Sequence, residues 1–218
     1  MATNYLKKIL SARVYDVARE TELQLAPELT KRLGNQVLLK REDNQPVFSF
    51  KLRGAYNKMA HLSPAALKRG VIAASAGNHA QGLAFAAKHF GVKAEIFIPL
   101  GASLSKINAC KGYGGIVLDG GESVDTAVLA AKARAVETGM AFCHPYDDVD
   151  VVAGQGTLGL ELLEDISDLA QVIVPLGGGG LLSGVALAIK QQRPDVKIIG
   201  VQTHDSDAML RSVNAGKR

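Results

Sequence analysis

The sequence predicts an α/β protein in which two open, twisted and mostly parallel sheets are flanked by helices. Short β-branched runs alternate along the chain with amphipathic segments, a pattern typical of βαβ units on a parallel sheet. The composition, 47% hydrophobic and 21% charged residues, is that of a globular protein rather than a disordered one. A length of 218 residues is enough for one large domain or two small ones.

Seven short runs rich in apolar or β-branched residues are predicted as strands. They cover residues 37–39, 71–74, 94–98, 116–118, 141–144, 172–175 and 197–202. Between them, Ser63 and Pro64 predict the N-cap and the first residue of a helix, while Gly91 and Gly139 predict helix ends. Residues 123–138 give the clearest helix, because their apolar side chains recur at helical spacing.

Composition and charge patterning exclude several classes of protein. Apolar stretches are shorter than the roughly 20 residues of a membrane span, and the two cysteines lack a disulfide framework. The net charge of +4 is spread along the chain without a basic stripe, so we expect neither nucleic-acid nor membrane partners. The N-terminus has no apolar signal-peptide core, which favours a cytoplasmic location.

Domain boundaries are predicted at two polar stretches, residues 41–49 and 145–150. We expect residues 50–148 to form a smaller α/β domain. Residues 1–49 and 149–218 are expected to form a larger domain that is incomplete at its C-terminus.

A run of four glycines follows the predicted strand 172–175. These residues are Gly177, Gly178, Gly179 and Gly180. Such a run costs conformational entropy, but it lets backbone N–H groups approach a phosphate, beside a helix predicted to begin near Leu181. Ser183 stands where a dinucleotide fingerprint needs its third glycine, so a compact phosphate monoester is favoured. The structural alternative is a tight strand-to-helix turn.

A second polar turn follows the predicted strand 71–74 and opens a helix. Its residues are Ser75, Ala76, Gly77, Asn78 and His79. Ser75 is expected to cap the helix, whose free N–H groups, with the Asn and His side chains, favour a carboxylate site. Ordinary helix capping is the alternative.

Lys51 is the candidate catalytic residue. Ser49 is predicted as an N-cap, which puts Lys51 in the first helical turn, where the helix dipole opposes a cation. Burial beside Phe48 and Phe50 would lower the pKa of the amine further and make it a better nucleophile. A solvated surface lysine is the alternative.

A phosphate site, a carboxylate site and a reactive amine together suit pyridoxal phosphate bound to an α-amino acid. In such chemistry the lysine holds the cofactor as an imine until the substrate amine displaces it. The freed lysine then moves the Cα proton.

Four motifs carry a resemblance to a known family. They are SFKLRGA at 49–55, SAGNHAQG at 75–82, AGQGT at 153–157 and PLGGGGL at 175–181. In this order they closely resemble the threonine dehydratases (threonine ammonia-lyases). These enzymes belong to the tryptophan-synthase-β-like, fold-type II group of pyridoxal phosphate enzymes, together with serine racemase.

The resemblance implies a role for each motif residue. Lys51 would carry the cofactor as a Schiff base, Phe50 would lie against its ring, and Asn78 would hydrogen-bond its phenolic oxygen. The phosphate would be held by Gly177, Gly178, Gly179, Gly180 and Leu181. The substrate carboxylate would be bound by Ser75, Ala76, Gly77, Asn78 and His79.

The implied activity is dehydration and deamination of L-threonine, and of L-serine as a second substrate, to 2-oxobutanoate or pyruvate and ammonia. Serine racemases have a second serine at the position of Ala76; alanine cannot exchange a proton, which favours elimination. Gln202 replaces a glutamate of the racemases' cation site, so no metal is expected. The family's catalytic units continue past Arg218, which implies a C-terminally truncated chain. The resemblance also implies a homo-oligomer in the full-length protein and a role in isoleucine biosynthesis.

Three alternatives stay open at this point: a related serine racemase or dehydratase, a nucleotide-binding oxidoreductase domain, and an inactive cofactor-binding fragment. Cys110 and Cys143 are interpreted as packing residues. Surface or capping roles are expected for His61, His89, His144 and His204. Residues 154–157 are predicted to open a helix.

Overall fold

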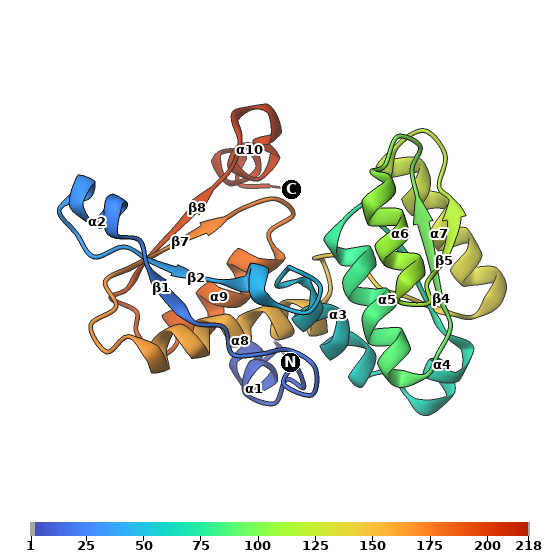
Figure 1. The fold of residues 1–218 in the computed structure, drawn as a ribbon, viewed down its shortest axis with the longest axis horizontal. Helices are drawn as coiled ribbons and strands as arrows, with labels where there is room; N and C mark the ends of the chain where they lie inside the picture. Colours follow the sequence, from blue (N-terminus) through green and yellow to red (C-terminus); the bar gives the residue numbers. More distant parts are fainter. Residues whose placement is uncertain (1–2, 218) are drawn as a thin grey trace.

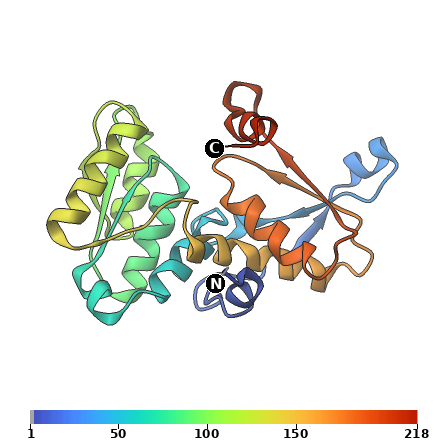
Figure 2. The same cartoon turned by 180° about the vertical axis from the view of Figure 1, so that it is seen from behind.

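Two lobes with a pair of packed helices at their junction make up the protein. The computed structural model describes residues 3–217. One lobe contains α4 to α7 and the strands β3 to β6, and the other contains β1, β2, β7 and β8 with their helices (Figures 1 and 2). Helix α3 (Lys51–Ala60) packs against α5 (Asn78–Phe90) of the first lobe and against α8 (Val149–Asp165) of the second.

The first lobe is built on a four-stranded parallel sheet in the order β5-β4-β3-β6. Its strands are β3 (Val71–Ala74), β4 (Ala94–Ile98), β5 (Ile116–Asp119) and β6 (Ala141–Phe142). Its helices are α4 (Pro64–Arg69), α5, α6 (Leu104–Gly112) and α7 (Val124–Thr138). This sheet with helices on both faces confirms the predicted α/β class.

Alternation along β3 sets which helix covers which face of this sheet. Val71 and Ala73 pack into the core shared with Leu83 of α5, whereas Ile72 and Ala74 pack with Ala127 of α7. Both faces are therefore buried, which explains why parallel strands read as continuous apolar runs.

The second lobe carries two separate pairs of strands. Strands β1 (Leu23–Leu25) and β2 (Leu38–Lys40) are antiparallel, and β7 (Gln171–Pro175) and β8 (Lys197–Val201) are parallel. The remaining elements are α1 (Tyr5–Leu10), α2 (Pro27–Leu33), η1 (Glu42–Asn44), α9 (Gly180–Lys190), η2 (His204–Ser206) and α10 (Ala208–Ala215). The β7–β8 pair leaves Ile173 62% and Val201 52% exposed.

Most predicted elements are found within one or two residues of their expected bounds. Ser63 is the N-cap of α4 with Pro64 as its first residue, and Gly91 and Gly139 end α5 and α7 in the left-handed conformation. Strand β1 was missed, because three residues without a β-branched side chain carry too short a signal.

The prediction that residues 154–157 open a helix is wrong. Helix α8 begins five residues earlier, where the Asp148 carboxylate accepts the N–H groups of Asp150 and Val151. The motif lies in the middle of α8, where its glycines permit close helix contacts. A Cβ on Gly154 would lie 2.7 Å from the backbone of Arg53 and Gly54.

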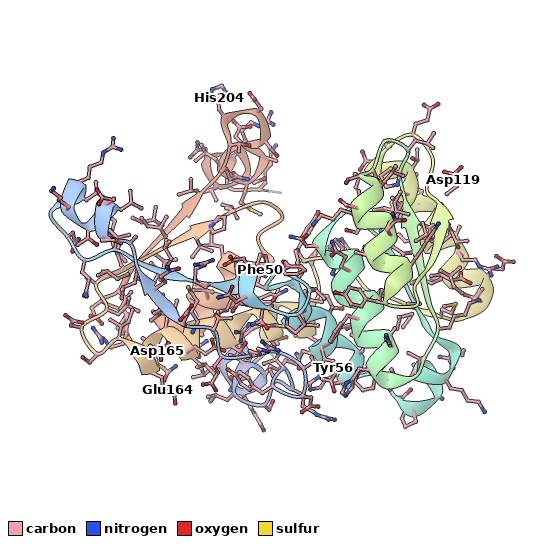
Figure 3. All side chains as sticks on the ribbon, viewed as in Figure 1. Phe50, Tyr56, Asp119, Glu164, Asp165 and His204 are labelled. Carbon is pink, nitrogen blue, oxygen red and sulfur yellow. The ribbon has the colours of Figure 1, made fainter. Side chains whose placement is uncertain are left out.

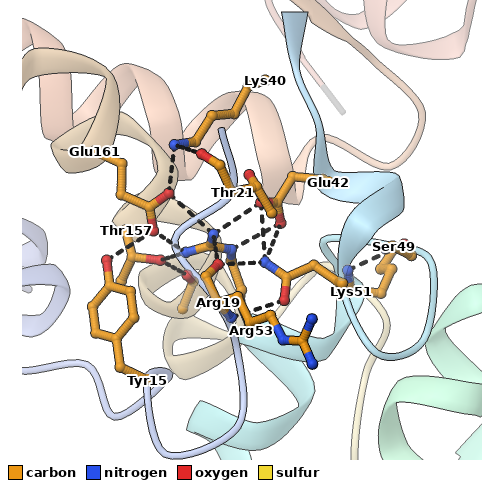
Figure 4. A network of polar contacts seen from close by, with 12 residues as sticks. Tyr15, Arg19, Thr21, Lys40, Glu42, Ser49, Lys51, Arg53, Thr157 and Glu161 are labelled. Atoms are coloured by element: carbon orange, nitrogen blue, oxygen red, sulfur yellow. Dashed lines mark hydrogen bonds and ion pairs between the residues drawn. The ribbon is translucent and has the colours of Figure 1, made fainter. Parts of the chain in front are cut away.

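A fully buried guanidinium ties α3 to the second lobe. Arg53 donates to both carboxylate oxygens of Glu42 at 2.9 Å, to Glu161 of α8, to Thr157 at 3.1 Å and to the Arg19 carbonyl at 3.0 Å (Figure 4). Arg53 is 0% exposed. Because a buried charge is costly unless it is paired and hydrogen-bonded, this network fixes the start of α3.

The close contact of α8 with α3 generates a first prediction. Gly154→Ala should lower the free energy of unfolding by about 1–3 kcal/mol, because its Cβ overpacks the backbone of α3. Gly112→Ala is the matched control: a Cβ there meets nothing within 4 Å, so a gain of about 0.5–1 kcal/mol is expected. Urea unfolding measures both, and equal effects would contradict the packing argument.

The Arg53 network generates a second prediction. Arg53→Met should cost about 3–5 kcal/mol of stability, because it removes the guanidinium that Glu42 and Glu161 share and leaves Glu161 with Lys40, at 2.9 Å, as its cation partner. Arg211→Met is the control, since Arg211 pairs with Asp207 on the exposed surface of α10. Thermal unfolding should show a large drop for the first variant alone; a drop shared by both would argue against the network.

Candidate active site

Lys51 is the first residue of α3, and its side chain is half-buried. Its backbone N–H donates to the Ser49 hydroxyl at 3.2 Å (Figure 4). Its Nζ donates to the Pro145 carbonyl at 2.6 Å. The amine lies 5.5 Å from the centre of the Phe50 ring. Burial lowers the pKa of Lys51 to about 8, so roughly a tenth of the amine is uncharged at pH 7.

The local structure around Lys51 follows the sequence prediction with one shift. Lys51 lies in the first helical turn as expected. The N-cap of α3 is Phe50 and not the predicted Ser49, whose hydroxyl nevertheless accepts the backbone N–H of Lys51. Phe50 lies between the two lobes in Figure 3, far from His204. Phe48, with a positive φ of 56°, is 73% exposed. Phe50, and not Phe48, therefore borders the amine.

Gly82 lets α5 approach the start of α3. A Cβ at this position would lie 3.3 Å from the carbonyl group of Lys51 and the N–H nitrogen of Leu52, so a side chain there would push the two helices apart. The segment that follows β3 is thereby held close to the candidate lysine.

The polar turn after β3 differs from its prediction at Ser75. Helix α5 begins at Asn78 with Gly77 as its N-cap, and the Ser75 hydroxyl accepts the Gly77 N–H at 3.2 Å, so Ser75 is not the helix cap. A Cβ on Gly77 would meet nothing within 4 Å. The first N–H groups of α5 have no partner within the helix, and the space beside the N-cap Gly77 is open.

The side chains of Asn78 and His79 are held by the protein. The Asn78 Oδ1 accepts a hydrogen bond from Lys106 Nζ at 2.7 Å. His79 is buried and its Nε2 donates to the Cys143 carbonyl at 3.0 Å; burial, together with the nearby Lys51, lowers its pKa to about 4. The imidazole is thus neutral near pH 7. Ala76, between Ser75 and Gly77, is half-buried against the core.

The tetraglycine loop connects β7 to α9. Helix α9 begins at Gly180, one residue before the predicted Leu181, and Gly179 adopts a left-handed φ of 92°. A Cβ on Gly178 would collide with the Tyr146 ring, and one on Gly180 would lie 3.0 Å from the Tyr146 backbone. Gly177 has nothing within 4 Å of its Cβ position. The loop is therefore packed on one side by Tyr146 and open at Gly177.

Residues 143–146 bring the three motifs together. Cys143 accepts from His79, Pro145 accepts from Lys51, and Tyr146 packs against Gly178 and Gly180. Sequence reasoning missed Pro145 and Tyr146 as site residues. The available signal was their position directly after β6, which neighbours β3, because adjacent parallel strands end at the same edge of a sheet.

Most other residues singled out from the sequence lie outside this arrangement, and Cys143 takes part in it only through its backbone carbonyl. Cys110 and Cys143 are buried and unpaired, and burial raises the pKa of their thiols to about 11 and about 12. Asp207 pairs with Arg211, and Gln202 accepts the Leu210 N–H. Within residues 3–217 the structure contains no cluster of three His, Cys, Asp or Glu side chains suited to a metal.

Comparison with known proteins shows which family this chain belongs to. The family described as "Pyridoxal-phosphate dependent enzyme" matches residues 14–218. The chain is 56% identical to L-threonine dehydratase biosynthetic IlvA of Burkholderia multivorans, covering 99% of this chain and 43% of that protein. It is 49% identical to L-threonine ammonia-lyase of Thermotoga maritima, covering 93% and 50%. The chain thus spans half or less of the length of these relatives.

Solved structures agree with the sequence relatives. Threonine deaminase isoform 2 of Solanum lycopersicum superposes with a TM-score of 0.95 at 46% identity, covering 98% of this chain and 59% of that one. Maize serine racemase gives 0.94 at 35% identity, covering 97% and 65%. The resemblance drawn from the four motifs is confirmed, and the chain belongs to the family of pyridoxal-phosphate dependent enzymes.

Proposed function

We propose that this chain carries the catalytic lysine of an ammonia-lyase that converts L-threonine, and L-serine as a second substrate, to a 2-oxo acid and ammonia. The single observation that carries the proposal is the placement of Lys51. Its amine is half-buried and has a lowered pKa, and it donates a hydrogen bond to the Pro145 carbonyl. The next residue, Tyr146, packs on the glycine loop. The relatives named threonine dehydratase and threonine ammonia-lyase support the substrate.

The residues present fit pyridoxal phosphate. Phosphate needs backbone N–H groups at close range, and Gly177 to Gly180 offer a loop without side chains that ends at the positive end of α9. The cofactor's aldehyde needs an uncharged amine, and Lys51 supplies one at a measurable fraction near pH 7. Phe50, beside that amine, offers an aromatic face to the ring.

The chain's own groups then have distinct tasks. When bound, pyridoxal phosphate attaches the amino acid and withdraws electrons from its Cα. The N–H groups at the start of α5 would hold the substrate carboxylate, and Asn78, whose Oδ1 accepts from Lys106 Nζ, would hydrogen-bond the cofactor's phenolic oxygen through its amide nitrogen. Lys51 Nζ removes the proton from Cα, because its lowered pKa leaves it able to accept one. Loss of the β-hydroxyl as water and hydrolytic release of ammonia give the 2-oxo acid.

Ala76 favours elimination over racemisation. Racemisation requires a second acid or base on the opposite face of Cα, and a methyl group can neither give nor take a proton. Ala76 lies in the turn that follows β3, between Ser75 and Gly77. A lyase is therefore favoured over a racemase, although structures of both kinds superpose on this chain.

Two further assignments belong to this proposal. The four-stranded sheet lies entirely within residues 50–148, which supports a smaller domain there and a larger one from residues 1–49 and 149–218. Relatives named "biosynthetic" support a place in isoleucine synthesis. The cytoplasmic location and the homo-oligomeric state expected from the sequence remain part of the proposal. No helix among residues 3–217 is long and apolar enough to cross a membrane.

Cofactor trapping tests the role of Lys51. Borohydride treatment with pyridoxal phosphate should fix the cofactor on the Lys51 peptide, as read by mass spectrometry, and Lys51→Ala should lose both the adduct and 2-oxo acid formation, by about 10²- to 10⁴-fold. Lys68→Ala on α4 is the matched control and should retain both. A cofactor adduct at another lysine in the unaltered chain would remove Lys51 from its role.

The lowered pKa of Lys51 predicts a distinct pH profile. Acylation by acetic anhydride requires the uncharged amine, so Lys51 labelling should rise with a midpoint near pH 8 rather than 10.5. Lys58, on the same helix, is the internal control: burial lowers its pKa, but its ion pair with Asp148 at 2.7 Å outweighs this and raises it. Its midpoint should therefore lie higher, and coincident curves would contradict the burial of Lys51.

A further inference from the structure

His144 organises the segment that joins Lys51 to the glycine loop. Its Nδ1 accepts the backbone N–H groups of Tyr146 at 3.3 Å and of Asp147 at 2.8 Å. The His144 ring also meets the Tyr146 ring edge-on, with centroids 4.6 Å apart. One imidazole therefore closes the turn at residues 144–147 and sets the direction of the Tyr146 side chain.

The turn closed by His144 has two further contacts, one with each half of the candidate site. The carbonyl of Pro145 accepts from Lys51 Nζ at 2.6 Å. The Tyr146 ring fills the space where a Cβ of Gly178 would lie, and its backbone lies against Gly180. A change in the turn would therefore alter both the hydrogen bond to the Lys51 amine and the packing of the glycine loop.

We propose that His144 is a positioning residue, whose imidazole holds the Pro145 carbonyl at the Lys51 amine and the Tyr146 ring against the glycine loop. This role deepens the proposed function and relies on it for the identity of the reaction. The ring need not touch substrate or cofactor. It acts as a hydrogen-bond acceptor, which requires the neutral tautomer with its proton on Nε2.

The charges around His144 are compatible with that neutral form. Burial lowers the pKa of His144, and Lys132 and Lys51 act in the same direction, while Asp147 and Asp148 oppose them. Phe142 covers the ring edge-on at 6.2 Å. Protonation would turn the acceptor nitrogen into a donor facing two N–H donors, so the turn would lose both hydrogen bonds.

Two substitutions separate the acceptor from the ring. Asparagine keeps an acceptor oxygen near the Nδ1 position and commonly caps turns in this way, whereas alanine removes it. The control is His204→Ala, because His204 is fully exposed on η2. Thermal unfolding of each variant of the 218-residue chain first establishes that it folds.

Two measurements then read the two contacts without relying on turnover. The first is the acylation midpoint of Lys51 before any cofactor is added. The second is the affinity for pyridoxine 5′-phosphate, which has the phosphate but no aldehyde and so reports the loop alone. In His144→Ala we expect the Lys51 midpoint to move up by about one pH unit, because the loosened turn lets water reach the amine. We also expect this variant to bind pyridoxine 5′-phosphate at least tenfold more weakly, because Tyr146 no longer holds the glycine loop in place.

The comparison decides the proposal. His144→Asn and His204→Ala should match the unaltered chain in both measurements. Unchanged values in His144→Ala, or equal losses in the Ala and Asn variants, would overturn the acceptor role. If the Ala variant does not fold, His144→Phe takes its place, because phenylalanine keeps a ring but has no acceptor nitrogen. It should bind pyridoxine 5′-phosphate more weakly than His144→Asn does, and equal affinities would overturn the acceptor role.

Failure of the proposed function is visible separately. It would appear as an unaltered chain that attaches no pyridoxal phosphate at Lys51. The comparison of His144 variants by Lys51 acylation uses no aldehyde cofactor and does not depend on that result.

Discussion

The buried charge of Arg53 is the constraint on which the position of the candidate lysine depends. A guanidinium without access to water must have acidic partners, and here they come from η1 and α8. Both partners lie in the second lobe, whereas α3 also packs on α5 of the first. Since Lys51 begins the same helix, one ionic network determines where the reactive amine sits between the lobes.

The site assembles at strand ends contributed by both lobes. Strands β3 and β6 are neighbours, so the turns that follow them lie side by side, and the buried contact of His79 with Cys143 joins them. The glycine loop arrives from β7 of the other lobe and meets this pair through Tyr146. The amine, the carboxylate turn and the loop thus share one short segment as their common neighbour.

Local signals were enough to predict much of this arrangement. Short runs rich in apolar or β-branched residues predicted β3 and β4 to the residue, and apolar side chains at helical spacing predicted α7 to within one residue. Long-range packing could not be predicted. Nothing near Gly154 shows that the backbone of α3 will lie against it, and nothing near Tyr146 shows that Gly178 will lie beside its ring. Such contacts depend on three-dimensional neighbours that a linear pattern does not encode.

The β7–β8 pair has a practical consequence for anyone who purifies this chain. Two parallel strands that pair only with each other among residues 3–217, and that present Ile173 and Val201 to water, offer a ready template for a strand from another molecule. The tendency of the chain to self-associate should therefore depend on the β7–β8 pair more than on the net charge. Dilute samples and mild solubilising additives are the appropriate starting conditions.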